Sequence, residues 1–408
     1  MDKHKLWTKD FLIVFLTNLF IFLTFYLLVV IFSAYAMEKL DATQSQAGLA
    51  ASIFILGVLI ARPFAGKFIQ SVGHKKILYI GLAFSIMTTI LYFEINNLML
   101  LLLNRFLHGV AFGLAATATN TIVVGLISSE HRGKGIGYFT LSNTLASAIG
   151  PFLGLFISQY GDYQMIFLVC IVFAISGFII TAFLKVATPA VPQTKSTSSK
   201  GFHLKDYIEM KAVPISIVVG LINFSYSSIL TFLMAYAKDI QLVDAASFFF
   251  VVFAISILVS RPFTGKWFDT KGENFVMYPS LLSFAVGLIL LSQSHNGFTL
   301  LLAGVFIGLG FGTLQSSTQA IAIKSSPHHR AGLATSTFFL LGDVGMVTGP
   351  YLLGFLLPFT GYRGLYVTIA ILVFASIALY YLLHAKKVRV ANVNLEINET
   401  KNSKRVML

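Results

Sequence analysis

Charged residues are scarce in this sequence. Only 11% of its 408 residues are Asp, Glu, Lys or Arg, against about a quarter in soluble globular proteins, and 56% are hydrophobic. The mean hydropathy is +0.82. A chain with so few charges and so many apolar residues is excluded from the class of ordinary soluble domains.

Cysteine is almost absent, and the signatures of common enzymes are missing. The single Cys170 lies inside an apolar stretch, so we expect neither a disulfide framework nor a Cys-based metal site. The sequence has no P-loop (G-x-x-x-x-G-K-[ST]), no H-E-x-x-H and no G-x-S-x-G motif. We therefore expect no ATP-driven pump, no enzyme, no cofactor and no metal.

Long apolar runs are what the sequence has instead. The runs from Phe11 to Met37 and from Ile77 to Phe93 contain no charged residue, and as helices they can cross a hydrocarbon core of about 30 Å. Continuous runs exclude a β-barrel, whose strands alternate over about 10 residues. The pattern predicts an all-α polytopic membrane protein with twelve transmembrane helices, at 11–37, 47–67, 77–95, 98–127, 136–158, 163–185, 213–236, 246–265, 275–293, 298–323, 332–357 and 363–384.

The cations follow the ends of these segments. If the N-terminus is cytoplasmic, the inside loops hold nearly every Lys and Arg, and the outside loops keep only Lys39, Lys238 and Arg363. This asymmetry predicts a cell-membrane protein with both termini in the cytoplasm. It also accounts for the net charge of +13 without a nucleic-acid partner.

A repeat shows that the chain consists of two similar halves. RPFAGKFIQSVGHKK starts at Arg62 and RPFTGKWFDTKG at Arg261, an offset of 261 − 62 = 199 residues. The same step relates further landmarks, namely Gly113 to Gly312, Gly150-Pro151 to Gly349-Pro350, and Tyr163 to Tyr362. We expect a six-helix bundle at 1–186, a polar cytoplasmic linker at 187–212, a second six-helix bundle at 213–385 and a disordered cytoplasmic tail at 386–408.

Two six-helix halves in parallel repetition resemble the major facilitator superfamily, and the resemblance covers nearly the whole chain. The family's loop motif runs roughly Gly-x-x-x-Asp-x-x-Gly-Arg/Lys-Arg/Lys, and its positions here hold Gly66, Gln70, Gly73, His74, Lys75 and Lys76, with Gln70 in place of the acid. The second-half copy keeps the acid but lacks the cations, with Gly265, Asp269, Gly272, Glu273 and Asn274.

Two further motifs are similar to those of drug and metabolite exporters of this superfamily. Gly150-Pro151 in SAIGPFLG resembles their Gly-Pro motif, and Arg105 with Gly109 in RFLHG resembles their Arg-x-x-x-Gly motif. The resemblance implies an efflux-type transporter that moves small molecules by alternating access in exchange for protons. We expect it to work as a monomer in the lipid bilayer.

One acid lies well inside a predicted span. Asp343 follows Gly332 by 343 − 332 = 11 residues, about 16 Å along a helix, which is near mid-membrane. A carboxylate at that depth costs several kcal/mol unless it faces water, is paired or is protonated. Asp343 is therefore the candidate proton carrier, and the alternative is a structural acid that binds neighbouring helix ends.

Arg105 and His108 share a face of the fourth span because they are three residues apart. Arg105 either holds an anionic group or tunes the proton site, or it stabilises helix packing. His108 titrates near neutral pH in water, although packing histidines are more common.

Polar residues at matching places in both halves predict the lining of a central substrate cavity. Interhelical hydrogen bonding uses the same residue types and is the alternative. The candidates are Asn18, Tyr26, Asn120, Asn223, Tyr226, Gln315 and Gln319, of which Asn120 and Gln319 are related by the repeat, 319 − 120 = 199.

Glycines, prolines and two arginines are candidates for helix approach and gating. Gly109 with Gly113, and Gly308 with Gly312, should let helices pack closely. Gly150-Pro151 and Gly349-Pro350 should bend their helices at seams that rock. Arg62 and Arg261 should snorkel or pair with a loop carboxylate at a cytoplasmic gate, with simple anchoring as the alternative.

The function we expect is therefore proton-driven export of small amphipathic compounds. The alternatives within the same fold are export of one metabolite, such as a siderophore or sugar, and solute import. A membrane receptor or scaffold is the alternative of a different class.

Overall fold

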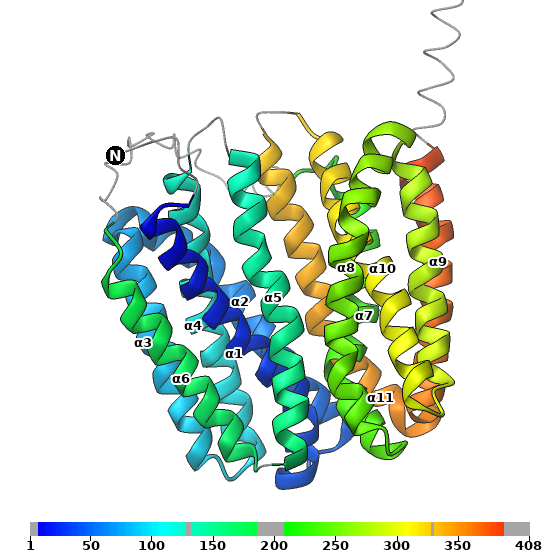
Figure 1. Cartoon of the computed structure of the whole chain (residues 1–408), viewed down its shortest axis with the longest axis horizontal. Coiled ribbons are helices and arrows are strands. Elements are labelled where there is room, and N and C mark those ends of the chain that lie inside the picture. The colour runs from blue at the N-terminus through cyan, green and yellow to red at the C-terminus, as the bar shows by residue number, and fades with distance from the viewer. Residues whose placement is uncertain (1–6, 128–131, 161, 186–207, 328–329, 387–408) are drawn as a thin grey trace, which may run out of the picture.

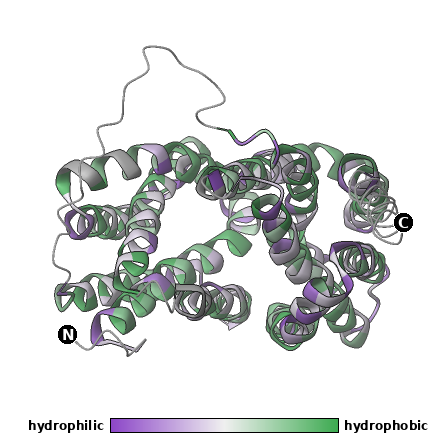
Figure 2. Cartoon of the chain, turned by 90° about the horizontal axis from the view of Figure 1, so that it is seen from above, coloured by the Kyte–Doolittle hydropathy of each residue, from purple (hydrophilic) through white to green (hydrophobic). Residues whose placement is uncertain are grey.

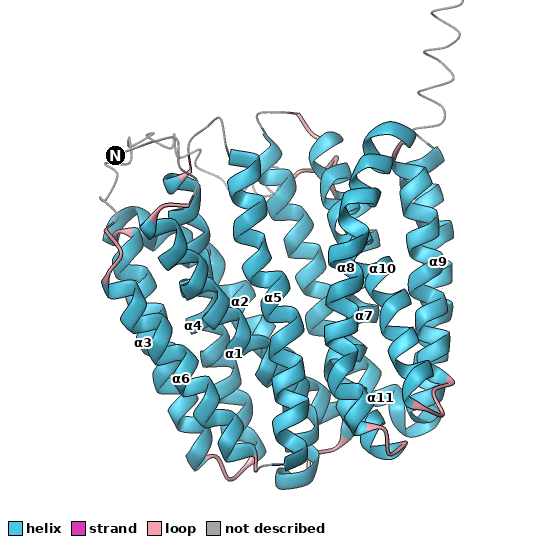
Figure 3. Ribbon diagram, in the orientation of Figure 1, coloured by secondary structure: helices cyan, strands magenta, loops and turns pink. Residues whose placement is uncertain are grey.

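The computed structural model describes residues 7–127, 132–160, 162–185, 208–327 and 330–386. The predicted linker at 187–212, apart from its last five residues, and the predicted tail after residue 386 lie outside this part. The described residues form helices joined by short loops, with no strand among them (Figure 3). The prediction of an all-α membrane protein is confirmed.

The long helices are bounded as follows: α1 Lys9–Leu40, α2 Gln44–Val72, α3 His74–Leu91, α4 Leu98–Leu126, α5 Arg132–Tyr160, α6 Tyr163–Ala182, α7 Val213–Asp239, α8 Val243–Lys271, α9 Glu273–Ser292, α10 Gly297–Lys324 and α11 Ala331–Tyr380. A 3₁₀ turn at Tyr92–Glu94 follows α3, and a π-helical turn at Tyr381–Ala385 follows α11. Eleven of these segments are long and apolar enough to cross a membrane. Gly361 interrupts α11 with a non-helical backbone (φ 63°, ψ 178°), and its two arms match the predicted eleventh and twelfth spans.

The repeat seen in the sequence governs where helices begin and end. α8 starts and ends 199 residues after α2, since 243 − 44 and 271 − 72 both give 199. Asn97 and Asn296 are the N-caps of α4 and α10, and each side chain accepts a hydrogen bond from the backbone three residues later. Gly73 (φ 98°) and Gly272 (φ 85°) make the turns after α2 and α8. Side-chain-bearing residues rarely adopt these backbone angles, so glycine is required at both turns.

The helices run side by side through the molecule (Figure 1). Figure 2 looks along them. The start of α1 and the π-helical turn after α11 lie at the same end of the helices, which we call the terminal face (Figure 1). The turn between α1 and α2 lies at the other end, which we call the opposite face.

The outer surface is apolar, as expected for a protein surrounded by lipid. Met99 and Phe298 are each 76% exposed, and Ile371 is 63% exposed. A soluble monomer rarely exposes so many large hydrophobic side chains together. In a bilayer these side chains face hydrocarbon, so exposing them does not cost the free energy that contact with water would.

Glycines bring α2 and α4 into backbone contact. A Cβ added to Gly109 would overlap the carbonyl oxygen of Phe54, and one added to Gly113 would lie 2.7 Å from the Cβ of Ala61. In the second half, a Cβ on Gly308 would overlap the Phe253 carbonyl in the same way. The predicted close approach at these glycines is confirmed.

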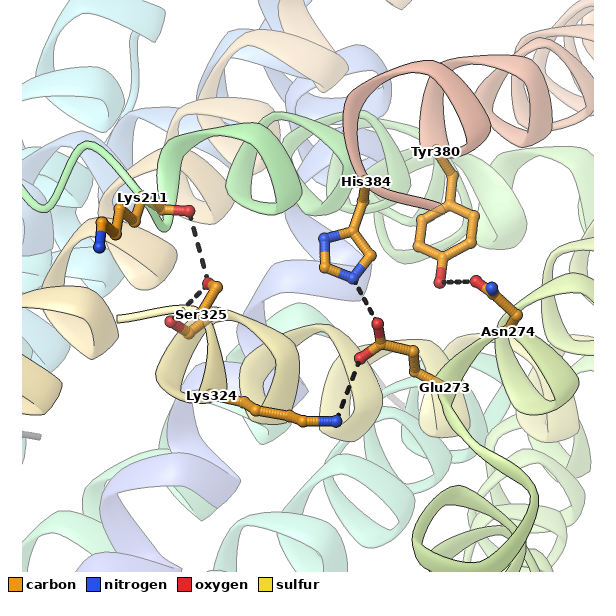
Figure 4. Close-up of polar contacts among 8 residues, drawn as sticks. Lys211, Glu273, Asn274, Lys324, Ser325, Tyr380 and His384 are labelled. Carbon is orange, nitrogen blue, oxygen red and sulfur yellow. Dashed lines mark hydrogen bonds and ion pairs between the residues drawn. The ribbon is translucent and has the colours of Figure 1, made fainter. Parts of the chain in front are cut away.

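A charged cluster fixes the terminal end of the second half (Figure 4). Glu273, the first residue of α9, is 7% exposed and accepts a hydrogen bond of 2.7 Å from His384 Nε2. Lys324 Nζ at the end of α10 lies 4.0 Å from the same carboxylate, and Tyr380 donates to Asn274 at 2.7 Å. Glu273 and Asn274 thus join three helix ends at the positions where the loop motif of the first half carries His74 and Lys75.

We predict that Gly109→Ala destabilises the protein by about 1–3 kcal/mol, because the added methyl group has no room against Phe54. Gly125→Ala on the same helix is the control, since a Cβ there meets nothing within 4 Å. It should stabilise the helix by about 0.5–1 kcal/mol. Thermal unfolding of the purified variants in detergent compares them, and equal stability of the two would contradict the assigned packing.

Candidate transport site

An ion pair joins the two halves of the chain. Arg62 of α2 donates through Nη1 to Asp343 Oδ2 of α11. The side chains are 41% and 17% exposed, so the acid is the more buried partner. Asp343 follows the start of α11 by 343 − 331 = 12 residues, about 18 Å along the helix.

This pairing corrects one expectation and links two others. Arg62 was expected to snorkel or to pair with a carboxylate in a loop, whereas its partner lies within a helix of the other half. A carboxylate inside a membrane-spanning segment is costly when isolated, and the guanidinium of Arg62 reduces that cost. The candidate proton carrier and the candidate gate residue are therefore one unit.

The helices that carry this pair touch along their length toward the opposite face. A Cβ on Gly48 of α2 would overlap the carbonyl oxygen of Pro350 of α11. A Cβ on Gly354 would lie 2.6 Å from the Cα of Ser45. Gly349-Pro350 thus lies at a tight seam between the halves, and Arg62–Asp343 lies further along the same seam, toward the terminal face.

Other polar contacts between the halves lie near the opposite face. Lys238 Nζ at the end of α7 is 2.5 Å from Glu38 at the end of α1. Gln159 of α5 donates to Ser247 of α8 at 2.9 Å. The two halves are therefore held together at the opposite face by contacts separate from Arg62–Asp343.

Arg105 is completely buried in α4 and is bound by backbone and rings. Its Nε donates to the carbonyl of Ala50 at 3.1 Å and its Nη2 to that of Ala51 at 3.3 Å. The guanidinium carbon lies 4.5 Å from the ring centre of Phe32 and 4.6 Å from that of Phe54. Cation–π contact in a dry site contributes about 2 kcal/mol, so these rings hold the charge between α1, α2 and α4.

His108 is held on both sides of its ring. Its Nδ1 lies 3.1 Å from the hydroxyl of Tyr92 and its Nε2 lies 3.1 Å from that of Ser85. The side chain is 2% exposed. This environment favours the packing alternative, and it ties α4 to α3 and the turn that follows α3.

The polar residues expected to line a cavity fall into two groups. Asn18 is fully buried: its Nδ2 donates to Ser142 at 2.8 Å and to Asn143 at 2.6 Å, and its Oδ1 accepts from Thr119 at 3.0 Å. Gln315 of α10 donates to Asn223 of α7. These residues form hydrogen bonds between helices, which favours the alternative of interhelical hydrogen bonding over cavity lining.

The second group is less constrained. Tyr26 is partly buried and packs on Phe22 and Phe25. Asn120 is exposed, and its side chain donates within its own helix to the carbonyl of Ala116 at 2.7 Å. Gln319 is partly buried. Tyr226 is 4% exposed and stacks on the Phe311 ring at 3.8 Å, so its ring belongs to the aromatic core of the second half.

The loop-motif residues lie at the terminal face and act on neighbouring helix ends. Lys75 donates to the carbonyl of Leu184, just past α6, at 2.6 Å, whereas Lys76 is exposed. Gly66 lies within α2, and the side chain of Gln70 lies outside the described residues. In the second copy Asp269 is exposed, and a Cβ on Gly265 would meet nothing within 4 Å.

The Gly-Pro motif of the first half has a packing role. A Cβ on Gly150 of α5 would lie 2.7 Å from the Cβ of Tyr26 on α1. Pro151 follows inside α5, and α5 continues through it. The motif therefore permits close contact of α1 and α5.

Comparison with known proteins agrees with this architecture. The family model described as Major Facilitator Superfamily matches residues 14–278 and 242–401. The chain belongs to the major facilitator superfamily. It is therefore a multi-pass membrane transporter.

Individual relatives are distant. The chain is 25% identical over 368 residues to the uncharacterized MFS-type transporter YhhS of Escherichia coli K12, with 88% of each chain covered. It is 26% identical over 356 residues to the multidrug resistance protein MdtL of Citrobacter koseri, covering 84% of this chain and 87% of that protein. A crystal structure of the peptide transporter POT in complex with sulfate superimposes with a TM-score of 0.74 at 15% identity, covering 94% and 95% of the two chains.

Several partners of these site residues were missed at the sequence level. Phe32 and Phe54 around Arg105, and Tyr92 and Ser85 around His108, carried no motif that marked them. A weak signal existed for Phe54, because the repeat step places Phe253 in the second half at its position, 253 − 54 = 199.

We predict that Arg62→Gln and Asp343→Asn each lower stability, and that the double variant recovers part of the loss. Each single change leaves one charge without its partner, whereas the double change leaves a neutral pair. A coupling energy of about 0.5–3 kcal/mol is expected from the double-mutant cycle, measured by thermal unfolding in detergent.

The control for this cycle is Lys238→Gln at the exposed pair with Glu38, where both side chains are more than a third exposed. Its effect should stay within about 1 kcal/mol. Strictly additive effects of Arg62→Gln and Asp343→Asn would contradict an energetic link between the two residues.

Proposed function

We propose that this protein exports small amphipathic compounds across the cell membrane in exchange for protons. The observation that carries the proposal is the ion pair between Arg62 of α2 and Asp343 of α11, because its two members come from different halves. In an alternating-access transporter the halves move relative to each other around the substrate. A pair across them has to break or rearrange when they move.

Protonation of Asp343 supplies a reason for the pair to break. The ionised carboxylate is attracted to Arg62, whereas the neutral carboxylic acid loses most of that attraction. A proton that reaches Asp343 therefore weakens the contact between α2 and α11 and shifts the balance between the two arrangements of the halves. Release of the proton restores the ion pair.

The direction of transport follows from the proposed orientation. The cation asymmetry of the loops supports a cytoplasmic terminal face. Protons then enter from the opposite face and leave at the terminal face, while the compound moves outward. The relationship to MdtL, named as a multidrug resistance protein, supports export over import.

The remaining polar and aromatic candidates suit amphipathic cargo. Gln319 and Asn120 occupy equivalent positions in the two halves, and Tyr26 adds an aromatic ring with a hydroxyl group. Such a mixture offers hydrogen bonds without demanding one shape. We propose these three residues as substrate contacts.

We predict that Asp343→Asn abolishes substrate-driven proton movement. The protein is reconstituted in liposomes with a pH-sensitive dye, and a panel of amphipathic compounds is added under an imposed pH gradient. Asn keeps the size of the side chain and can still accept a hydrogen bond from Arg62, but it cannot carry a proton. Wild-type protein should show proton flux that depends on the compound, and the variant should show none.

Asp269→Asn is the matched control, because Asp269 is an exposed acid on α8. Its flux should equal that of the wild type. Wild-type flux with Asp343→Asn would assign the proton to another group. If no compound in the panel drives proton flux through the wild-type protein, proton-coupled export of such compounds is refuted.

A further inference from the structure

Three arginines lie inside the membrane-spanning parts of the described chain away from the helix ends, and they differ in what holds their charge. Arg62 has the carboxylate of Asp343. Arg105 has two carbonyls and two aromatic rings, although its Nη1 is buried without a hydrogen-bond partner. Arg261 of α8 makes no hydrogen bond or ion pair through its guanidinium with any described residue, and its Nε is buried without a partner.

The repeat explains why Arg261 lacks a partner. Arg261 is the counterpart of Arg62, and the counterpart of Asp343 is Thr144 of α5, since 343 − 199 = 144. Thr144 is 7% exposed and donates within its own helix to the carbonyl of Thr140 at 3.4 Å. The second half thus carries the cation of the pair, but the first half does not provide the acid.

Equivalent residues of α2 and α8 face the other half at both seams, although their partners are not equivalent, since the counterpart of Pro350 is Pro151. Gly48 of α2 contacts Pro350 of α11, and Ser247 of α8, its counterpart by 247 − 48 = 199, bonds to Gln159 of α5. Arg62 and Arg261 each follow these contact residues by 14 positions, which is close to four helical turns. Arg261 therefore lies on the face of α8 that is turned toward α5, and it is partly exposed.

We propose that Arg261 binds an anionic group of the transported compound, a carboxylate or a phosphate, between α5 and α8. This inference rests on the proposed transport function and narrows the cargo to amphipathic anions. An arginine inside a membrane protein is costly unless it is paired, and the guanidinium matches the two oxygens of a carboxylate or phosphate. The cargo supplies the negative charge that Asp343 supplies at the other seam.

The experiment measures binding and so does not depend on transport. The purified full-length protein is placed in nanodiscs of zwitterionic lipid, and its thermal stability is measured against increasing 4-phenylbutyrate or 4-phenylbutyramide. These probes share a shape and differ in charge. The carboxylate should stabilise the wild-type protein and the amide should not.

Four variants assign the effect. Arg261→Gln should weaken binding of phenylbutyrate by roughly tenfold or more, since a charge-assisted hydrogen bond is worth about one order of magnitude in affinity. Thr144→Asp should abolish it by giving Arg261 an acid within the chain, whereas Thr144→Asn should retain it. Lys266→Gln removes an exposed cation five residues further along α8 and should retain it as well.

The outcomes separate the explanations. Equal stabilisation of Arg261→Gln and wild type, or no stabilisation by the carboxylate, would overturn the proposal. Nanodiscs with added phosphatidylglycerol test the other source of an anion: stabilisation by this lipid, but not by phenylbutyrate, that is lost in Arg261→Gln makes Arg261 a lipid site and overturns the assignment to cargo. Loss of proton flux in the liposome assay bears on antiport and leaves the binding result standing.

Discussion

The cost of a charge inside the membrane is the constraint on which this structure depends. Lipid offers an ionised side chain neither water nor counter-ions, so every arginine within a span needs a partner from the protein or its cargo. Arg105 is partnered by backbone carbonyls and aromatic rings of its own half, and it fixes α4 against α1 and α2. Arg62 is partnered across the halves. A charge whose partner lies in the same half makes that half more rigid. A charge whose partner lies in the other half is stabilised only in arrangements of the halves that keep the two residues together.

Much of the fold could be predicted from the sequence because membrane helices are encoded locally. An uninterrupted apolar run identifies a span, and the step of 199 residues identifies the two halves. The close approach of helices at Gly109 and Gly308 was predicted from the residue type alone. The kink at Gly361 was anticipated as a boundary between two spans, although the helix on each side of it is nearly continuous.

The site was harder to predict because its contacts join residues far apart in the chain. Arg62 and Asp343 are 281 positions apart, and the sequence around either residue does not indicate that the other is its partner. For His108 and Asn18, residue type suggested roles that their contacts in the structure do not favour. Their residue types suggested titration and substrate contact, whereas Tyr92, Ser85, Ser142 and Thr119 occupy their polar atoms. Contacts between side chains of different helices distinguish a functional role from a packing role, and the sequence does not give these contacts.

The broken symmetry at the two seams gives the proposed exchange a physical basis. At one seam the acid belongs to the protein, and in the proposed mechanism a proton on Asp343 weakens the contact between α2 and α11. At the other seam Thr144 replaces the acid, so the charge of Arg261 is left for a group that the chain does not carry. In a transporter with an acid at both seams, both arginines would form ion pairs within the protein, and neither would be left to bind cargo. With one acid, the proposed exchange has the proton act at one seam and an anionic compound at the other, and the two ligands influence each other because both act on the same movement of the halves.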